Sequence, residues 1–486
     1  MIDDSRTIRF TDQDLLLFSA ASGDKNPLHL SREYAARTSY GQQVVFGAFG
    51  AVAALGKVSP EESSRVLAMQ IDFLRPMFLG VDYRVRVTPQ QNGLLARLFD
   101  GTSTVVAVAL TLGEQRLDVA ATGMLAAGEF AQAEAISRKE SELQPGLRVS
   151  GRYATAQKAR MEICRKWQVT VPAPLMDMLL WSSYLIGMEL PGKTALFSRL
   201  TLELTGEPIA ADVFEYEMAI EQVDKRLGQL RIRGRLWQNS GTIASVECRA
   251  FSRPASPSVD TAAIQAELTP SDALLGKRVL LIGASRGLGA ALAAALASQG
   301  ARVIAVSRNS GSDPTGRIEF VAGDAADARW REELRTRILA EHGGLDLLIN
   351  NAFPALLPLL LEANTYSRIE EFMSRSIALT AGPLCSFLED LSNSKGAALL
   401  ISSTAVEQPV KEWPHYVAAK KAAEALLEVA ALQYPNVGFL VVRPEKMLTE
   451  MTNTPMGRRN AIAPEHMAVR IVQRIIQGIS GWQLLR

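Results

Sequence analysis

The feature that most constrains the fold is a regular alternation of short apolar segments with helical patterns in residues 275–486. Apolar segments such as RVLLIGAS, ARVIAVSR and DLLINNA are separated by helix-like stretches such as GAALAAALASQG. This alternation predicts repeated strand–helix–strand units, whose strands lie side by side in one buried parallel sheet. We therefore predict an α/β domain with a doubly wound parallel sheet in this part of the chain.

The preceding part of the chain has a different pattern, in which strand-like segments such as VLAMQIDFL, VDYRVRVTP and TSTVVAVALTL dominate. The order helix, connection, strand, turn and strand occurs at 46–87 and again at 172–220, which indicates an internal repeat. A stretch rich in Pro, Ser and Ala then leads into the last domain. The predicted divisions are a first half at 1–130, a second half at 147–255, a linker at 256–274 and a separate domain at 275–486.

Composition excludes several classes of protein. The chain has 486 residues with 52 basic and 51 acidic side chains, so it carries no field that would attract nucleic acid or a membrane surface. Its three cysteines are far apart and form neither a metal-binding spacing nor a disulfide framework. The first residues lack the apolar core of a secretory signal. We expect a cytoplasmic chain without a metal, a nucleic-acid partner or a membrane partner.

The segment FSAASGDKNPLHL, residues 18–30, places an acid and a histidine on either side of an Asn-Pro turn. Such a turn can fold the chain back so that Asp24 and His29 face one point. An imidazole and a carboxyl group at one point can take a proton from carbon and give a proton to a departing hydroxyl group. The segment therefore predicts acid–base chemistry.

The same segment resembles the MaoC-like, (R)-specific hydratase/dehydratase family. The residues that carry this resemblance are Gly23, Asp24, Asn26, Pro27, His29, Tyr34, Ala35 and YGQQVVFGAFG at 40–50. The resemblance implies a hot dog fold, an α+β architecture in which a curved sheet wraps a helix, and the repeat implies a double hot dog. It also implies that Asp24 and His29 are catalytic, with the backbone N–H of Gly47 as a donor to the thioester oxygen.

Two points qualify this resemblance. The family often has histidine immediately before the glycine, and this chain has Phe46 there. The other histidines are His342, His415 and His466, so residues 147–255 contain none. We therefore expect one dehydratase site per chain, with the second half non-catalytic and forming a wall for the acyl group.

A second group of residues begins with the glycine turn of VLLIGASRGLGAALAAALASQG, residues 279–300. Glycines between a strand and a helix let the backbone approach a pyrophosphate at the helix N-terminus. With GDAAD, LINNA and the spacing of Ser403, Tyr416 and Lys420, the turn resembles the short-chain dehydrogenase/reductase family over residues 275–486. The resemblance implies a Rossmann fold, with Tyr416 as proton donor to a carbonyl, Lys420 lowering the pKa of its phenol, and Ser403 binding the same carbonyl.

The resemblance also implies a bound dinucleotide. The residues expected to contact it are Gly283, Ser285, Arg286, Gly287, Gly289, Arg308, Asp324, Asn350, Asn351, Tyr416, Lys420 and Thr449. Arg286 and Arg308 occupy positions where cations meet a 2′-phosphate, so NADPH is the expected cofactor. Three positions depart from the family pattern: Phe353 after Asn-Ala, Leu379 in place of a relay asparagine, and Glu445 after Pro444.

Together the two groups predict a bifunctional, NADPH-dependent 3-oxoacyl-thioester reductase and (R)-3-hydroxyacyl-thioester dehydratase of fatty-acid or polyketide type. Its substrate would be carried by an acyl carrier protein or by CoA, and by family analogy we expect a homodimer. One alternative is an acyl-CoA hydratase and 3-hydroxyacyl-CoA dehydrogenase of catabolic type. The other is a dehydratase whose reductase domain is an inactive scaffold, which Phe353, Leu379 and Glu445 favour.

Overall fold

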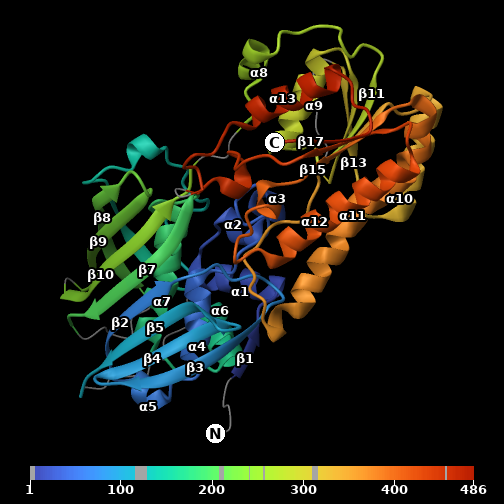
Figure 1. Cartoon of the computed structure of the whole chain (residues 1–486). Coiled ribbons are helices and arrows are strands. Elements are labelled where there is room, and N and C mark those ends of the chain that lie inside the picture. The colour runs from blue at the N-terminus through green and yellow to red at the C-terminus, as the bar shows by residue number, and fades with distance from the viewer. Residues whose placement is uncertain are drawn as a thin grey trace. The chain divides into compact units, whose positions relative to one another are not determined.

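The chain forms two compact units, Met1–Ala255 and Ser256–Arg486, each with its own core (Figure 1). A computed structural model describes residues 6–114, 128–206, 213–239, 241–254, 258–308, 316–454 and 457–486. Among these residues, no helix has both the length and the apolar character that a bilayer crossing requires. The predicted end of the first half falls beside 115–127, which lies outside the described residues.

One ten-stranded sheet organises the first unit. Its order is β1-β3-β4-β5-β2-β7-β10-β9-β8-β6, and its strand pairs are antiparallel. The strands are β1 (Arg6–Arg9), β2 (Val66–Phe73), β3 (Asp82–Gln90), β4 (Gly93–Asp100), β5 (Ser103–Leu112), β6 (Arg148–Ala154), β7 (Ala195–Leu204), β8 (Val213–Asp224), β9 (Gln229–Gln238) and β10 (Gly241–Ser252).

The strand order is symmetric about the pairing of β2 with β7. Read outward from that pairing, each half contributes a three-strand meander and then its own first strand at the sheet edge. The helices of this unit are α1 (Asp12–Ser22), α2 (Pro27–Leu30), α3 (Arg32–Ala36), α4 (Gly47–Leu55), α5 (Pro60–Ser63), α6 (Gln157–Trp167) and α7 (Ala173–Tyr184), with short turns at Glu140–Glu142 and Leu185–Glu189. The repeated order of elements that the sequence indicates is present in the structure.

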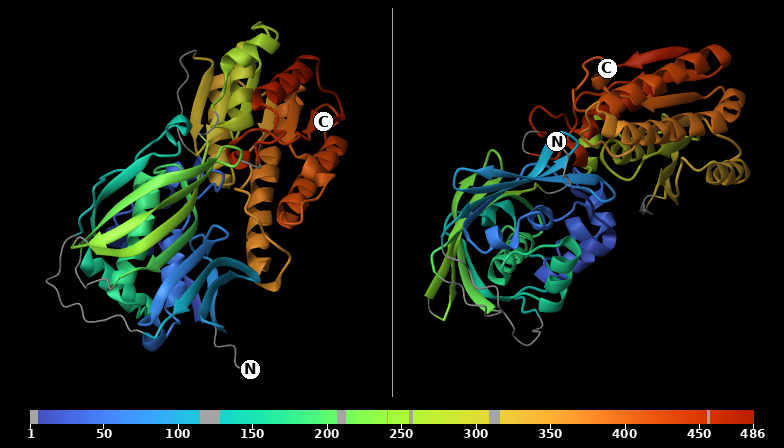
Figure 2. Two further views of the ribbon diagram at one scale, coloured as in Figure 1. Left: turned by 90° about the vertical axis from the view of Figure 1, so that its left-hand side faces the viewer. Right: turned by 90° about the horizontal axis from the view of Figure 1, so that it is seen from below.

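Helices α4 and α7 are the centre of this unit. Every residue from Ala48 to Leu55 in α4 and from Pro174 to Tyr184 in α7 is buried. Because α4 is apolar all round and α7 is mostly apolar, both helices are stable when other elements enclose them. The two helices pack together, and Figure 2 shows the sheet curving around them.

The halves differ most in the segment that leads into the central helix. In the first half, residues 23–46 connect α1 to α4 and include α2 and α3, whereas in the second half 168–172 alone connects α6 to α7. The segment that carries Asp24 and His29 therefore has no counterpart in the second half.

The second unit is a parallel sheet with the order β13-β12-β11-β14-β15-β16-β17. The strands that follow β11 are added first on one side of it, as β12 and β13, and then on the other side, as β14 to β17. This change of side between β11 and β14 is the doubly wound arrangement that the alternation predicts. Its strands are β11 (Arg278–Ile282), β12 (Arg302–Ser307), β13 (Ile318–Ala322), β14 (Leu347–Asn350), β15 (Ala397–Ile401), β16 (Gly438–Val442) and β17 (Trp482–Leu485).

Helices cover both faces of this sheet. Alternate residues of β11 face opposite ways: Leu281 packs into a core with α8, α9 and α13, and Leu280 packs into a core with α10, α11 and α12. The helices are α8 (Thr261–Glu267), α9 (Gly287–Ser298), α10 (Ala328–His342), α11 (Tyr366–Ser394), α12 (Pro414–Gln433) and α13 (Pro464–Ile476), with short turns at Ala363–Thr365, Thr404–Val406 and Glu450–Thr452. The central strands β15 and β16 are buried throughout because both sides of the sheet are covered there.

The segment 256–274 differs from its prediction as a linker. In its described residues it contains α8, and Ile264, Leu268 and Leu274 pack into the core of the second unit. Asp260 caps α8 through bonds to the N–H groups of Ala262 and Ala263. The second unit therefore begins before residue 275. The helix was not predicted because the segment was interpreted from its Pro- and Ser-rich composition and not from the spacing of its apolar residues.

Two candidate active sites

The turn that carries the first site follows directly from the end of α1. Gly23 ends the helix with a φ of +74°, a conformation that side chains disfavour. The side chain of Asp24 then accepts a bond from the N–H of Asn26 at 2.9 Å, and Asn26 in turn caps α2 through the N–H of Leu28. The chain therefore reverses within a few residues, as the Asn-Pro pair predicts, and His29 lies on α2.

Asp24 is a buried acid with 2% of its surface exposed. The hydroxyl group of Ser183, on α7 of the second half, donates to its Oδ2 at 2.7 Å. Burial raises the pKa of Asp24 to about 7, although the bonds from Asn26 and Ser183 act to lower it. A substantial fraction of Asp24 therefore carries a proton near neutral pH.

The pKa of His29 is shifted downward, whereas that of Asp24 is shifted upward. Its Nδ1 lies 2.7 Å from the carbonyl oxygen of Val44, which can only accept, so Nδ1 carries the hydrogen. In the neutral ring Nε2 is then unprotonated and can accept a proton. Burial lowers the pKa of His29 to about 4; the Val44 bond acts to raise it and the charge of Arg253 to lower it.

Phe46 explains part of this burial. Its ring stacks on the imidazole of His29 with 3.9 Å between ring centroids and 29° between the planes. Phe46 also precedes α4 as its cap residue, and no side chain caps that helix N-terminus. The first N–H groups of α4, including that of Gly47, therefore have no acceptor within the helix and can donate to a ligand.

Asp24, His29 and Gly47 line one cavity of about 250 Å³. Most of its wall is apolar and comes from both halves of the sheet. The side chains of this wall include Tyr40, Val44, Phe73, Leu74, Met77, Val106, Ile186, Leu196, Phe197 and Phe251, with Arg75 exposed on the same wall. The cavity places an acid, a base and helix N–H groups around one apolar space.

The second site lies at the carboxyl ends of the parallel strands. Gly283 directly follows β11 and has a φ of +88°, and a side chain on Gly289 would place its Cβ 1.9 Å from the carbonyl oxygen of Gly283. This cradle of bare backbone at the start of α9 fits the pyrophosphate of a dinucleotide. Arg286 precedes α9, and Arg308 is exposed directly after β12.

Several residues that are expected to contact the dinucleotide form hydrogen bonds to the backbone at the carboxyl edge of the parallel sheet. The amide group of Asn350 donates to the carbonyl oxygens of Leu379 and Thr380, and that of Asn351 donates to Gly283 at 2.7 Å. Three more expected residues lie at this edge: Ser285 in the exposed turn, Asp324 bonded to Arg375 and the N–H of Ala326, and Thr449 beside Gly287.

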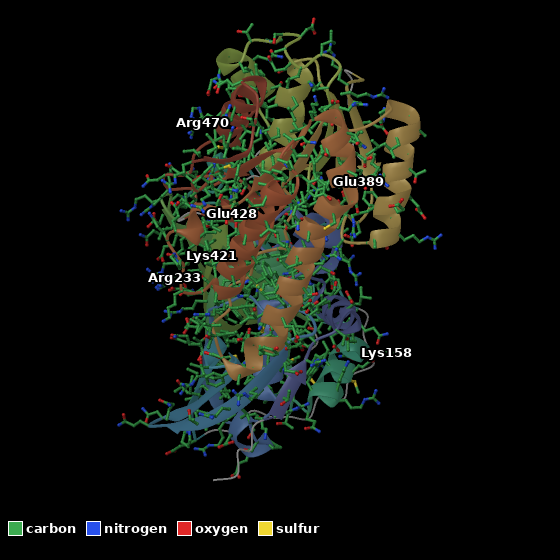
Figure 3. The ribbon with its side chains drawn as sticks, turned by 45° about the vertical axis from the view of Figure 1, so that its right-hand side comes forward. Lys158, Arg233, Glu389, Lys421, Glu428 and Arg470 are labelled. Carbon is green, nitrogen blue, oxygen red and sulfur yellow. The ribbon has the colours of Figure 1, made fainter. Side chains whose placement is uncertain are left out.

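Ser403, Tyr416 and Lys420 come together as their spacing predicts. Tyr416 is hydrogen-bonded to Ser403, and Lys420 lies one turn later on the inner side of α12. The neighbouring Lys421 points outward on the same helix, as Figure 3 shows. One turn of α12 therefore presents the tyrosine and the lysine from the same side.

Lys420 is not among the groups that shift the pKa of the Tyr416 phenol in this structure. Burial raises the pKa of Tyr416, and the group that acts to lower it is Ser403. Lys420 is itself buried, which lowers its pKa to about 7, and its Nζ donates to the carbonyl oxygen of Ile401 at 2.7 Å. A lysine that is desolvated and turned toward the backbone gives the phenol little of its charge.

Phe353 completes the enclosure of this lysine. Its ring centroid is 3.6 Å from Nζ of Lys420 and 5.8 Å from the ring of Tyr416. The structure thus fits a dinucleotide at the glycine turn, while at the other end the ring of Phe353 covers the ammonium group of Lys420, which is expected to meet ribose hydroxyl groups.

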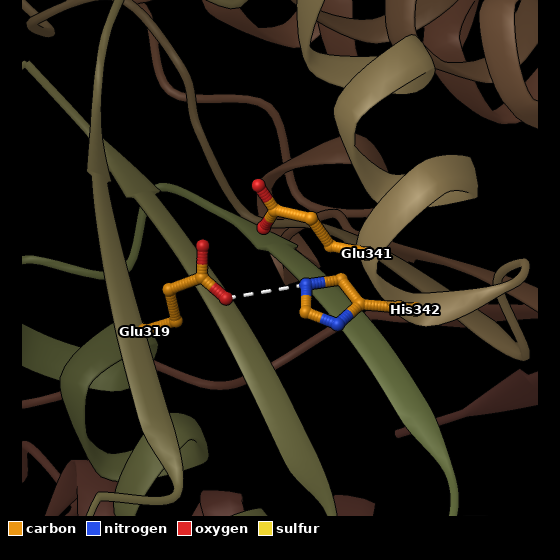
Figure 4. Close-up of side chains that lie close together, drawn as sticks. All are labelled: Glu319, Glu341 and His342. Atoms are coloured by element: carbon orange, nitrogen blue, oxygen red, sulfur yellow. Dashed lines mark ion pairs between the residues drawn. The ribbon is translucent and has the colours of Figure 1, made fainter.

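One further cluster resembles a cation site. Glu319, Glu341 and His342 lie together between β13 and α10, with His342 Nε2 3.2 Å from Glu319 (Figure 4). Arg337 forms ion pairs with both glutamates. Glu319 also lies near the start of β13, opposite the strand ends that carry the second site. The cluster is therefore an ion-pair network at the other edge of the sheet.

Sequence reasoning missed Ser183, which contacts Asp24 from the second half, and the contact of Phe353 with Lys420. Ser183 lies on an apolar helix beside another serine, so nothing local distinguishes it. The internal repeat was the only signal in the sequence for this contact, because two repeated halves that share one continuous sheet lie side by side. Phe353 was visible as a departure, but its contact with Lys420 depends on how the segment after β14 folds.

Comparison with known proteins identifies both parts of the chain. Residues 2–109 match the family model described as MaoC like domain, and residues 277–461 match that described as short chain dehydrogenase. Human L-xylulose reductase is 32% identical over 216 residues, covering 42% of this chain and 83% of that protein. For D-erythrulose reductase of Gallus gallus the identity is 28% over 211 residues, covering 42% and 82%.

A solved structure is also similar to the chain: the alcohol dehydrogenase of the archaeon Thermococcus sibiricus, complexed with 5-hydroxy-NADP. It is 23% identical, covers 43% of this chain and 96% of its own, and has a TM-score of 0.38.

Proposed function

Because the chain belongs to the short-chain dehydrogenase family and carries a MaoC-like domain at its N-terminus, we propose that it reduces 3-oxoacyl thioesters and dehydrates the resulting (R)-3-hydroxyacyl thioesters. The observation that carries this proposal is one cavity lined by both Asp24, an acid that is partly protonated near neutral pH, and His29, a base that remains neutral. The first unit is then a double hot dog with one active site.

In dehydration, His29 accepts a proton and Asp24 donates one. Nε2 of His29 takes the proton from the α-carbon while the N–H groups at the start of α4, with Gly47 first, bind the thioester oxygen as charge develops on it. The bond from C3 to its hydroxyl oxygen breaks with its electron pair, and Asp24 supplies a proton so that water leaves. A proton passing from His29 to Asp24 restores the starting state.

The cavity limits the acyl group. Its volume of about 250 Å³ lies below the roughly 300–1,000 Å³ typical of drug-sized ligand sites. Its wall is mainly aliphatic and aromatic, which suits a hydrocarbon chain. We propose a short acyl chain carried on CoA or on an acyl carrier protein, whose pantetheine arm would leave past the exposed residues Leu74 and Arg75.

In the second unit, bound NADPH would supply the hydride for ketone reduction. Tyr416 gives its phenolic proton to the carbonyl oxygen, and the hydroxyl group of Ser403, already bonded to Tyr416, binds the same oxygen. Arg286 and Arg308 would meet the 2′-phosphate, which supports NADPH over NADH. We propose that this pair of reactions serves fatty-acid or polyketide synthesis in a homodimeric enzyme.

The pH dependence of dehydration tests the assignment of acid and base. We expect kcat/KM to rise as pH increases through about 4, where His29 loses its proton, and to fall as pH increases through about 7, where Asp24 loses its proton. The measurement is absorbance of the enoyl thioester formed from an (R)-3-hydroxyacyl thioester across this pH range. A rate that rises through pH 7 contradicts the assignment.

Phe353 favours the alternative in which the second unit is an inactive scaffold. The effect of this ring on NADPH affinity tests that alternative directly. We expect Phe353→Ala to bind NADPH about tenfold more tightly, because the ring no longer covers Lys420. Fluorescence titration of NADPH gives the dissociation constant without turnover. Phe372→Ala, which removes another ring of the same cluster, is the control. If neither the wild type nor Phe353→Ala binds NADPH, the scaffold alternative holds.

A further inference from the structure

The carboxyl group of Asp24 lies against the half of the first unit that has no dyad of its own. Ser183 on α7 donates to Oδ2 at 2.7 Å, and both side chains are buried. Gly187, in the turn of helix that follows α7, approaches so closely that a Cβ there would lie 2.5 Å from both carboxylate oxygens. The second half thus touches the acid itself.

The turn around Asp24 is also docked on this same part of the second half. The amide group of Asn26 donates to the carbonyl oxygens of Gly187 at 2.9 Å and Gly192 at 3.2 Å. The N–H of Lys25 faces the sulfur of Met188 at 3.0 Å. Bonds on either side of Asp24 therefore fix it against residues 183–192.

We infer that Ser183 and Gly187 are positioning residues for Asp24, so that the second half orients the acid of a dyad whose two members both come from the first half. This inference rests on the proposed dehydratase function. Gly187 leaves space for the carboxyl group and Ser183 fixes its rotation. The second half is then part of the catalytic apparatus in addition to lining the acyl cavity.

The chemistry of the step gives Ser183 a second effect. When Asp24 transfers its proton to the leaving hydroxyl group, it becomes a carboxylate in a buried site, which is costly without donors. A hydrogen bond to a charged oxygen is stronger than one to a neutral oxygen. The bond from Ser183 therefore strengthens as the proton leaves, and it favours the state that the reaction forms.

The test compares two adjacent serines. Ser183→Ala removes the donor to Asp24, whereas Ser182→Ala removes a hydroxyl group that donates to Leu179 within the same helix. For Ser183→Ala we expect the pKa of Asp24 to rise by about one unit and kcat for dehydration to fall about tenfold with KM little changed. For Ser182→Ala we expect both quantities to equal the wild type. Ser183→Thr, which keeps the hydroxyl group, should restore the titration.

The titration is read by carboxyl ¹³C NMR of labelled aspartate, with the Asp24 signal assigned by its loss in Asp24→Asn. This readout needs no substrate, so it separates the two proposals. If the wild type dehydrates no thioester, the dehydratase proposal fails while the titration still tests the contact. If Ser183→Ala leaves the titration and kcat unchanged, or if Ser182→Ala shifts them equally, the positioning role is wrong.

Discussion

The Asp24→Asn variant is expected to dehydrate (R)-3-hydroxyacyl thioesters about a thousandfold more slowly than the wild-type chain. Asparagine has nearly the same shape and can still accept the bond from Ser183. It has no acidic proton to give, and general acid catalysis contributes roughly 10²–10⁴-fold to such reactions. The rate of enoyl thioester formation measures the loss.

His29→Ala is expected to cause a loss of similar size, because the ring nitrogen that accepts the α-proton is removed. Its matched control is His466→Ala, since His466 is exposed on α13 of the other unit and pairs with Glu267. Both dyad variants should oxidise NADPH with a 3-oxoacyl thioester at the wild-type rate. Dehydration that survives in Asp24→Asn and His29→Ala removes these residues from the mechanism.

Tyr416→Phe is the second large effect, with ketone reduction expected to fall by about a thousandfold. The phenylalanine keeps the packing against Phe353 and Trp413 but has no proton for the carbonyl oxygen. NADPH consumption with a 3-oxoacyl thioester measures the rate. The bond from Ser403 ends at the same hydroxyl group, so the variant also releases Ser403.

The control for this variant is Tyr366→Phe, because Tyr366 is 65% exposed at the start of α11. Dehydration of an added (R)-3-hydroxyacyl thioester should be unchanged in both tyrosine variants. If Tyr416→Phe alters no rate and the wild type also reduces no ketone, the scaffold alternative replaces the bifunctional one. A wild-type preference for NADH, with oxidation of the hydroxyacyl group, instead favours the catabolic alternative.

Local patterns were sufficient to predict the parallel sheet of the second unit and one turn of the first. The apolar strands of the second unit predict a buried parallel sheet because each strand is covered on both faces, as the alternating sides of Leu280 and Leu281 show. The turn at Asp24 was also predictable, since the Asn-Pro pair favours a turn and Gly23 can adopt the positive φ that ends α1. Patterns of this kind need no knowledge of distant contacts.

What escaped prediction depends on contacts between distant residues. Ser183 lies 159 positions from Asp24 in the sequence, and their contact exists because β2 pairs with β7. The pKa of Lys420 is lowered by burial, with the ring of Phe353 and the carbonyl oxygen of Ile401 in contact with its ammonium group, and its spacing from Tyr416 gave no sign of this. Spacing along a helix places a side chain but leaves its solvation undetermined.

The most direct test of the whole account is a time course by mass spectrometry of a short 3-oxoacyl thioester, on CoA and on a carrier protein, incubated with NADPH and the wild-type chain. The account predicts that the 3-hydroxyacyl thioester forms first and the 2-enoyl thioester follows, and that Asp24→Asn stops at the 3-hydroxyacyl stage. A 3-oxoacyl thioester that stays unchanged on both carriers, or an enoyl product that forms equally fast in Asp24→Asn, contradicts it.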